Sequence, residues 1–130
     1  MRTAALAGRC LGATFSRRAS VTAHSTKAQM STTAAPTKHW LLTYTYVEGI
    51  VEKRGPYRAA HLAGAQEQAD AGKLVMAGAV GEPPSGATFV WSPAASEEDI
   101  RRFVQSDVYV SAGLVTAWSI APFAVVVKGA

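Results

Sequence analysis

Apolar and polar positions alternate differently in successive stretches of this chain, and each stretch predicts an element. Four segments are rich in aromatic, β-branched or small apolar residues and are expected to be strands: Trp40–Val47, Leu74–Val80, Ala87–Trp91 and Thr116–Val127. Gly81–Gly86 combines glycine, proline and serine, which indicates a turn. The second and third strands should therefore pair as an antiparallel hairpin. We expect the last strand to be interrupted at Pro122, or to be a strand pair divided there.

Two segments have helical features. Gly55-Pro56 can open a helix, because proline is tolerated in the first turn, and the alanine- and glutamine-rich run Tyr57–Gly72 should continue it. Its predicted apolar stripe is Leu62, Ala65 and Ala69, with Gly72 just past the end. Ile50–Arg54 is interpreted as a separate helical turn before this helix.

The second helix is predicted to begin at Ser96. Ser96 is a suitable N-cap, and Asp99 three residues later resembles a capping box with aspartate in place of glutamate. Ile100, Phe103 and Val104 should form the buried face of this helix. The resulting order of elements is β-α-β-β-α-β. It predicts an α+β, ferredoxin-like domain with one antiparallel sheet and both helices on the same face.

Aromatic side chains are spread over all but one of the expected strands, so we expect that neither face of the sheet is polar. They are Trp40, Tyr44, Tyr46, Phe89, Trp91, Trp118 and Phe123. A sheet with helices on one side only must cover its other face. We therefore expect a homodimer in which two sheets pack face to face, an arrangement that can bury well over a thousand Å².

Charge divides the chain into two parts. Residues 1–38 carry six basic side chains and no acidic one, whereas residues 39–130 carry seven basic and nine acidic ones, a net charge of −2. The overall charge of +4 therefore describes the beginning of the chain. A folded part with a negative net charge disfavours nucleic-acid binding, which needs a basic face. We expect a leader at residues 1–37 and one domain at residues 38–130.

The leader is rich in Arg, Ser, Thr and Ala, which is typical of an organelle transit peptide. Early arginines opposite an apolar stripe favour a mitochondrial transit peptide. The alternatives are a chloroplast transit peptide and a tail that has this composition by chance. Translation from Met30 would produce a shorter form without the address, which would stay in the cytosol. The chain has no apolar run of about 20 residues that could span a bilayer.

Cysteine and histidine positions argue against several kinds of chemistry. The one cysteine, Cys10, lies in the predicted leader, so the domain has no thiol for a disulfide, a nucleophile or a thiolate metal site. His24 also lies in the leader, and His39 at its edge is 22 residues from His61. No pair has metal-ligand spacing. Gly78, Gly81 and Gly86 suit a hairpin turn better than a dinucleotide fingerprint. We expect no metal and no cofactor.

His61 is the candidate for chemistry in the predicted domain. It lies at the border of the expected buried face of the first helix, with Arg58 and Tyr57 one turn before it. Asp107 follows the second helix. Two helices that lie side by side on one face of a sheet can bring these residues together, and a carboxylate on one imidazole nitrogen orients the ring and raises basicity at the other. A lone histidine on a helix is, however, more often a partly buried structural residue, and Asp107 alone would be a helix-end residue.

Four short motifs occur here in an order that resembles the YCII-related family of small dimeric α+β barrel proteins. They are Tyr57-Arg58-Ala59-Ala60-His61-Leu62, Met76-Ala77-Gly78-Ala79 with its turn, Asp107-Val108-Tyr109, and Gly113-Leu114-Val115. The resemblance covers about residues 40–127. It implies that His61 and Asp107 form the active-site pair, with Arg58 beside the histidine. Val108 stands where the family has proline. Some relatives are linked to elimination chemistry on hydroxylated aromatic compounds.

Three hypotheses follow. In the first, the protein is a cofactor-independent enzyme in which His61, oriented by Asp107, moves a proton on a small aromatic or enol-like substrate. Arg58 would then stabilise negative charge on oxygen and Tyr109 would wall the pocket. In the second, the same fold is a non-catalytic ligand-binding or structural dimer module. In the third, exposed strand aromatics bind RNA, but the domain lacks the Lys/Arg-Gly-aromatic pattern and a positive net charge.

Overall fold

The computed structural model describes residues 35–129. Within this range the order of elements is β1 (Thr37–Tyr46), α2 (Ile50–Lys53), α3 (Gly55–Asp70), β2 (Leu74–Val80), β3 (Gly86–Trp91), α4 (Glu97–Ser106), α5 (Val108–Ser111) and β4 (Val115–Val125). With the one-turn helices α2 and α5 set aside, this is the β-α-β-β-α-β order. The ferredoxin-like α+β class is thereby confirmed. The predicted leader lies almost wholly outside the described residues.

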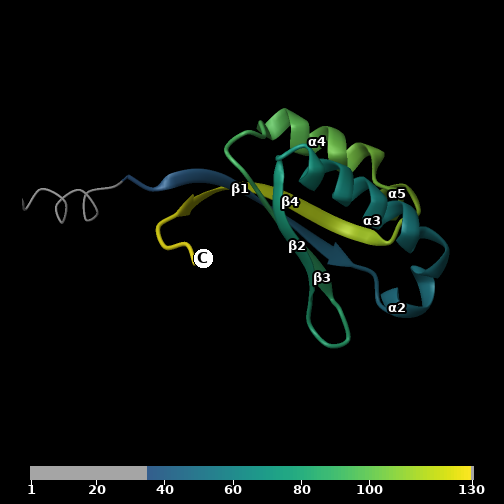
Figure 1. Cartoon of the computed structure of the whole chain (residues 1–130). Helices are drawn as coiled ribbons and strands as arrows, with labels where there is room; N and C mark the ends of the chain where they lie inside the picture. Colours follow the sequence, from purple (N-terminus) through teal and green to yellow (C-terminus); the bar gives the residue numbers. More distant parts are fainter. Residues whose placement is uncertain (1–34, 130) are drawn as a thin grey trace, which may run out of the picture. The chain divides into compact units, whose positions relative to one another are not determined.

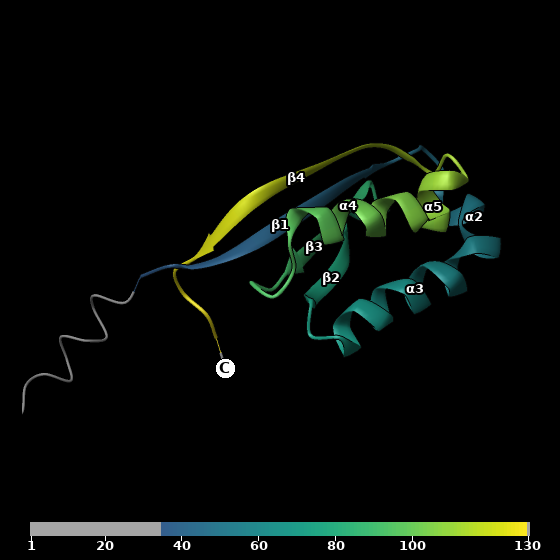
Figure 2. The same ribbon diagram turned by 90° about the horizontal axis from the view of Figure 1, so that it is seen from above.

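The four strands form one sheet with the order β2-β3-β1-β4, and every neighbouring pair is antiparallel. Helices α3 and α4 lie on the same side of this sheet (Figure 1). Seen from above, α4 crosses the middle of the sheet, while α3 lies on the side of β2 (Figure 2). The two helices are therefore placed so that their ends near α5 can share a site.

Aromatic contacts attach α4 to the sheet. The ring of Phe103 meets the ring of Trp91 edge-on at 5.2 Å between centroids, and that of Phe89 at 5.6 Å. Trp91, Phe89, Ile100 and Val104 are almost completely buried. Edge-to-face pairs of this kind add to the free energy gained from burial alone.

The helix boundaries agree with the expected signals. Pro56 stands in the first turn of α3, and Gly72 follows its end with a φ of 77°, a conformation that glycine adopts without steric cost. At α4, the Ser96 side chain accepts the backbone N–H of Asp99, and the Asp99 carboxylate accepts the backbone N–H of Ser96. The predicted capping box is present.

The apolar stripe expected on α3 is partly wrong. Leu62 is 47% exposed, and the buried residues of this helix are His61 and Ala65. An alanine-rich helix has only a shallow difference between its faces, so tertiary packing decides which face is buried. His39, expected at the edge of the leader, lies within β1 and is also buried.

The strand aromatics lie almost entirely on one face of the sheet. Residues directly opposite each other in an antiparallel pair share a face, and Trp40 pairs with Trp91 while Tyr44 pairs with Trp118. Strand alternation places six of the seven strand aromatics on the side of the helices, and only Phe123 on the other. β4 also runs without interruption through Pro122. As an edge strand it uses only every second N–H for pairing, so one proline is tolerated.

The face of the sheet away from the helices has no charged side chain in the described residues. Strand pairing places these residues on it: His39, Leu41, Thr43, Thr45, Met76, Gly78, Val80, Gly86, Thr88, Val90, Ala117, Ser119, Ala121 and Phe123. Met76 is 63% exposed and Val80 49%. We call this set of residues the open face. Among the described residues, none of the helices has the length and apolar character needed to cross a membrane.

Candidate functional site

His61 and Asp107 are hydrogen-bonded to each other. The Nδ1 atom of His61 lies 2.8 Å from Oδ1 of Asp107 and 3.0 Å from Oδ2. Both residues are buried, with 7% and 6% of their surfaces exposed. A contact between residues 46 positions apart in the sequence arises because α3 and α5 pack against each other on the same face of the sheet.

Local backbone structure fixes the position of the Asp107 carboxylate. Asp107 ends α4 and serves as the N-cap of α5, with an extended backbone at φ −75° and ψ 127°. Its Oδ1 accepts the backbone N–H of Tyr109 at 3.0 Å, the usual N-cap interaction. Val108 therefore occupies the first position of a helix, where proline is also well accommodated. The replacement of the family's proline by Val108 is compatible with this geometry.

Three donors converge on this one carboxylate. Besides His61 and the backbone of Tyr109, the hydroxyl of Tyr44 donates to Oδ2 at 2.9 Å. Burial, and then the negative charge of Asp107 and this hydrogen bond, raise the pKa of Tyr44 far above its ordinary value, so the phenol keeps its proton. An ionised carboxylate only accepts, so Nδ1 of His61 must carry a hydrogen. A neutral His61 then has its lone pair on Nε2.

The His61 ring is also held by its face. It stacks on the ring of Tyr109 with centroids 3.8 Å apart and planes 4° from parallel. Phe89 meets it edge-on at 6.2 Å. Nε2 has no hydrogen-bond partner in the described residues and is not among the side-chain atoms sealed from solvent there. One nitrogen is therefore engaged and the other remains available.

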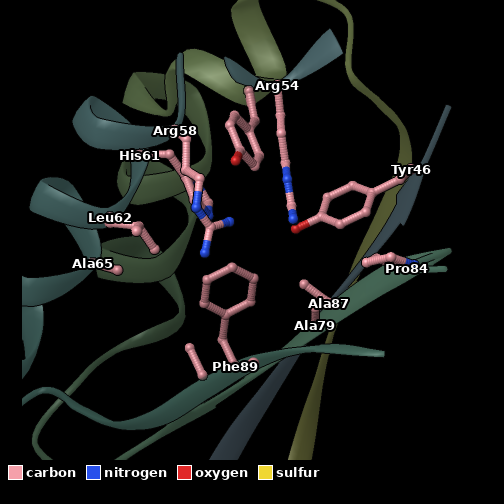
Figure 3. Close-up of a pocket in the computed structure, with 13 residues that line it drawn as sticks. Tyr46, Arg54, Arg58, His61, Leu62, Ala65, Ala79, Pro84, Ala87 and Phe89 are labelled. Atoms are coloured by element: carbon pink, nitrogen blue, oxygen red, sulfur yellow. The ribbon is translucent and has the colours of Figure 1, made fainter. Parts of the chain in front are cut away.

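A cavity of about 300 Å³ lies next to His61. Residues from α3, the ends of β1 and β2, the β2–β3 turn, β3 and α5 line it, and many of them are shown in Figure 3. They are Tyr46, Arg54, Arg58, His61, Leu62, Ala65, Ala77, Gly78, Ala79, Pro84, Ala87, Phe89 and Tyr109. This volume is at the lower end of the range of small-molecule sites, and it suits a ligand of about one ring.

The cavity is electropositive. Arg54 and Arg58 both point their guanidinium groups into it (Figure 3), and no acidic residue occurs among the described residues that line it. Burial raises the pKa of Tyr46 to about 12, even though the two arginine charges act in the opposite direction. At neutral pH the Tyr46 phenol is therefore an uncharged hydrogen-bond donor in a cavity that also contains two arginines.

The structure brings together all four residues singled out in the sequence. His61, Arg58 and Tyr109 line the cavity, and Asp107 holds His61 from behind. Three further residues of the site, Tyr44, Tyr46 and Arg54, were not predicted from the sequence. The spacing of Arg54, Arg58 and His61 along one side of a helix was the signal that could have included Arg54.

Among the described residues, no group of three or more histidine, cysteine, aspartate or glutamate side chains could hold a metal ion. The segment Gly81–Gly86 forms the turn between β2 and β3. Gly86 is required there because a Cβ would collide with the carbonyl oxygen of Tyr44. These glycines therefore serve the hairpin.

Comparisons with known proteins agree with this fold. The model of the YCII-related domain family matches residues 38–124, so the chain belongs to this family. Among solved structures, the chain is similar to 5-chloro-2-hydroxyhydroquinone dehydrochlorinase from Burkholderia phenoliruptrix AC1100, in complex with 2,5-dihydroxybenzoquinone. The TM-score is 0.54 and the identity 22%, over 65% of this chain and 92% of the other. Among curated proteins, none is significantly similar.

Proposed function

We propose that this protein is a small enzyme that needs no cofactor and uses His61 to move a proton on a small aromatic or enol-like substrate. The observation that carries the proposal is the hydrogen bond from Nδ1 of His61 to the buried Asp107 carboxylate, beside a cavity that His61 lines. Imidazole–carboxylate pairs of this kind support general acid–base catalysis.

In the proposed step, Nε2 of His61 takes a proton from an O–H or an acidic C–H of the substrate. Asp107 stabilises the imidazolium that forms, and Arg58 stabilises the negative charge left on the substrate oxygen. The electron pair then either expels a leaving group or recaptures the proton at another atom. The first outcome is an elimination and the second an isomerisation. The bacterial neighbour is named for a dehydrochlorination, which is an elimination.

Two features support the interpretation of His61 as a positioned base and not as a packing residue. Tyr109 holds the ring by its face, and Asp107 holds it by one edge. Tyr44 donates to Asp107 and leaves the carboxylate fewer ways to rotate. His61 also lines the cavity that contains the two arginines.

The test is proton exchange in deuterated water, followed by NMR, for a panel of hydroxylated aromatics and enols. We expect wild-type protein to accelerate exchange or conversion of at least one compound. His61→Gln should slow it by about 10²- to 10⁴-fold. His39→Gln is the matched control, because His39 is buried in β1 and does not line the cavity. Equal rates for wild-type protein and His61→Gln would overturn the mechanism. Binding without any exchange would favour the non-catalytic ligand-binding module.

We further propose that two copies pair through the open face. Its lack of charged side chains, and the exposure of Met76 and Val80 on it, support this. Exposed apolar patches of this kind mark association surfaces.

The proposed compartment is the mitochondrion, as the composition of residues 1–37 indicates. A fluorescent protein fused after residue 37 should enter mitochondria, whereas a fusion that starts at Met30 should stay in the cytosol. Chloroplast import of the longer fusion would favour the alternative compartment.

A further inference from the structure

The two arginines of the cavity occupy different positions in it. Arg58 lies on α3 one turn before His61, and the two side chains are next to each other in Figure 3. Arg54, at the start of α3, extends from the other side of the cavity toward Tyr46 (Figure 3). The cavity therefore has a cation beside the proposed base and a second cation beside the Tyr46 phenol.

The proposed proton transfer assigns the stabilisation of the oxyanion to Arg58, which leaves Arg54 without a role. Arg54 is only half-buried, but its guanidinium group has no carboxylate partner among the described residues. The start of α3 adds partial positive charge at the same place. A permanently anionic group on the ligand would compensate this charge.

We propose that the substrate carries a carboxylate that Arg54 and Tyr46 bind, at a distance from the oxygen that reacts beside His61 and Arg58. This inference rests on the proposed function and names the substrate class for the same cavity. A guanidinium fork matches a planar carboxylate and can bind both of its oxygens. The neutral phenol of Tyr46 would donate a further hydrogen bond to the carboxylate.

The floor of the cavity indicates a flat body between these two groups. Ala79 lies opposite Ala87, and Ala77 opposite Phe89, on the helix side of the β2–β3 hairpin. Alanine methyl groups keep this floor low, and the Phe89 ring offers an apolar wall. An aromatic or enolic ring with one carboxylate fits a cavity with small side chains on its floor and two arginines at its sides.

The experiment compares two ligands that differ only in the carboxylate, which is the proposed anchor of the substrate. 2,5-Dihydroxybenzoate and hydroquinone share the ring and both hydroxyls, and only the first has a carboxylate. Calorimetry or NMR titration with wild-type protein should show at least tenfold tighter binding of 2,5-dihydroxybenzoate. Arg54→Gln and Tyr46→Phe should each reduce this preference, and Arg54→Gln should remove most of it. Arg54→Lys keeps the positive charge but lacks the two-pronged guanidinium group. This variant should therefore retain only part of the preference for the carboxylate.

Lys53→Gln is the matched control. It removes one positive charge at the neighbouring position, but Lys53 does not line the cavity, so the preference should remain. Thermal unfolding of each variant shows whether it is folded. Equal affinity for the two ligands, no detectable binding of the carboxylate at millimolar concentration, or a preference that survives Arg54→Gln overturns the proposal. Tighter binding of phenyl phosphate than of the carboxylate overturns it in favour of a phosphate anchor.

His61→Gln separates this proposal from the proposed function. If the carboxylate preference remains in His61→Gln while proton exchange is lost, both proposals stand. If the preference is present but exchange does not depend on His61, the anchor stands and the mechanism falls. If exchange depends on His61 but the preference for the carboxylate is absent, the anchor falls and the mechanism stands.

Discussion

The imidazole of His61 and the phenol ring of Tyr109 lie face to face, 3.8 Å apart and within 4° of parallel. Tyr109 comes two residues after Asp107, whose carboxylate binds both His61 Nδ1 and the Tyr109 backbone N–H. One turn of chain therefore holds the ring by its edge and by its face. This double restraint leads to the first prediction.

Tyr109→Leu should loosen the ring, whereas Tyr109→Phe should not. The leucine variant loses the stack and part of a buried side chain, so we expect a loss of about 2–4 kcal/mol in the free energy of unfolding. The phenylalanine variant keeps the stack. Because the Tyr109 hydroxyl is buried and has no hydrogen-bond partner among the described residues, its removal should change stability by less than about 1 kcal/mol. Urea denaturation measures both values. A large loss in Tyr109→Phe would mean that the hydroxyl has a partner in solution.

Asp107→Asn should change the tautomer of His61. An asparagine side chain can present its N–H₂ to Nδ1, and the hydrogen of the neutral ring would then move to Nε2. We expect the ¹⁵N shifts of His61 to report hydrogen on Nδ1 in wild-type protein and a substantial population on Nε2 in the variant. Loss of hydrogen bonds to a charged acceptor should also cost about 1.5–3 kcal/mol of stability. An unchanged tautomer would contradict the orienting role of Asp107.

Tyr44→Phe and Tyr46→Phe form a matched pair on one strand. The Tyr44 hydroxyl donates to the buried Asp107 carboxylate, so its removal should lower the free energy of unfolding by about 1.5–3 kcal/mol. The Tyr46 hydroxyl has no hydrogen-bond partner in the described residues, and its removal should cost less than about 0.5 kcal/mol. Chemical denaturation gives the comparison. Equal losses in the two variants would show that the hydrogen bond from Tyr44 to Asp107 adds nothing to the free energy of unfolding.

Alkaline pH should destabilise the protein. Burial raises the pKa of Tyr46 from 10.0 to about 12, and burial and Asp107 raise that of Tyr44 further. Above pH 10 the unfolded chain loses phenolic protons that the folded state keeps, so the free energy of unfolding falls as pH rises. For Tyr46 this fall is complete near pH 12. Tyr46→Phe should therefore show a shallower fall between pH 10 and 12, as measured by urea denaturation across this range. The same slope as in wild-type protein would contradict the buried state of this phenol.

A charge on the open face should prevent pairing. Val90 lies on this face in β3, a central strand. We expect wild-type protein to sediment as a dimer and Val90→Lys as a monomer. Val51→Lys is the control: Val51 is exposed on α2, away from the sheet, and this change should leave the dimer intact. A monomeric wild type would remove the pairing proposal.

Local signals predicted most elements well, because they depend on neighbouring residues. Pro56, Gly72 and the Ser96–Asp99 box act within one turn of chain, and the hairpin turn 81–86 needs only its own glycines and prolines. Predictions that depended on which face is buried were weaker. Leu62 was expected in the core and is exposed, and Pro122 was expected to interrupt a strand that continues through it.

The candidate site was predicted in part for the same reason. His61, Arg58, Asp107 and Tyr109 belong to short motifs that can be recognised in the sequence. Tyr44, Tyr46 and Arg54 come to the site through strand register and through the approach of α3 to the hairpin, and neither is encoded by neighbouring residues.

The order of strands and helices, the helix ends and the family membership follow from the chain itself, because propensity, capping and motif order are properties of adjacent residues. The hydrogen bond between His61 and Asp107, the two cationic positions of the cavity and the uncharged open face are products of the tertiary structure. They depend on segments that are distant in sequence, which meet only when burial of the apolar faces forces α3, α5 and the sheet together.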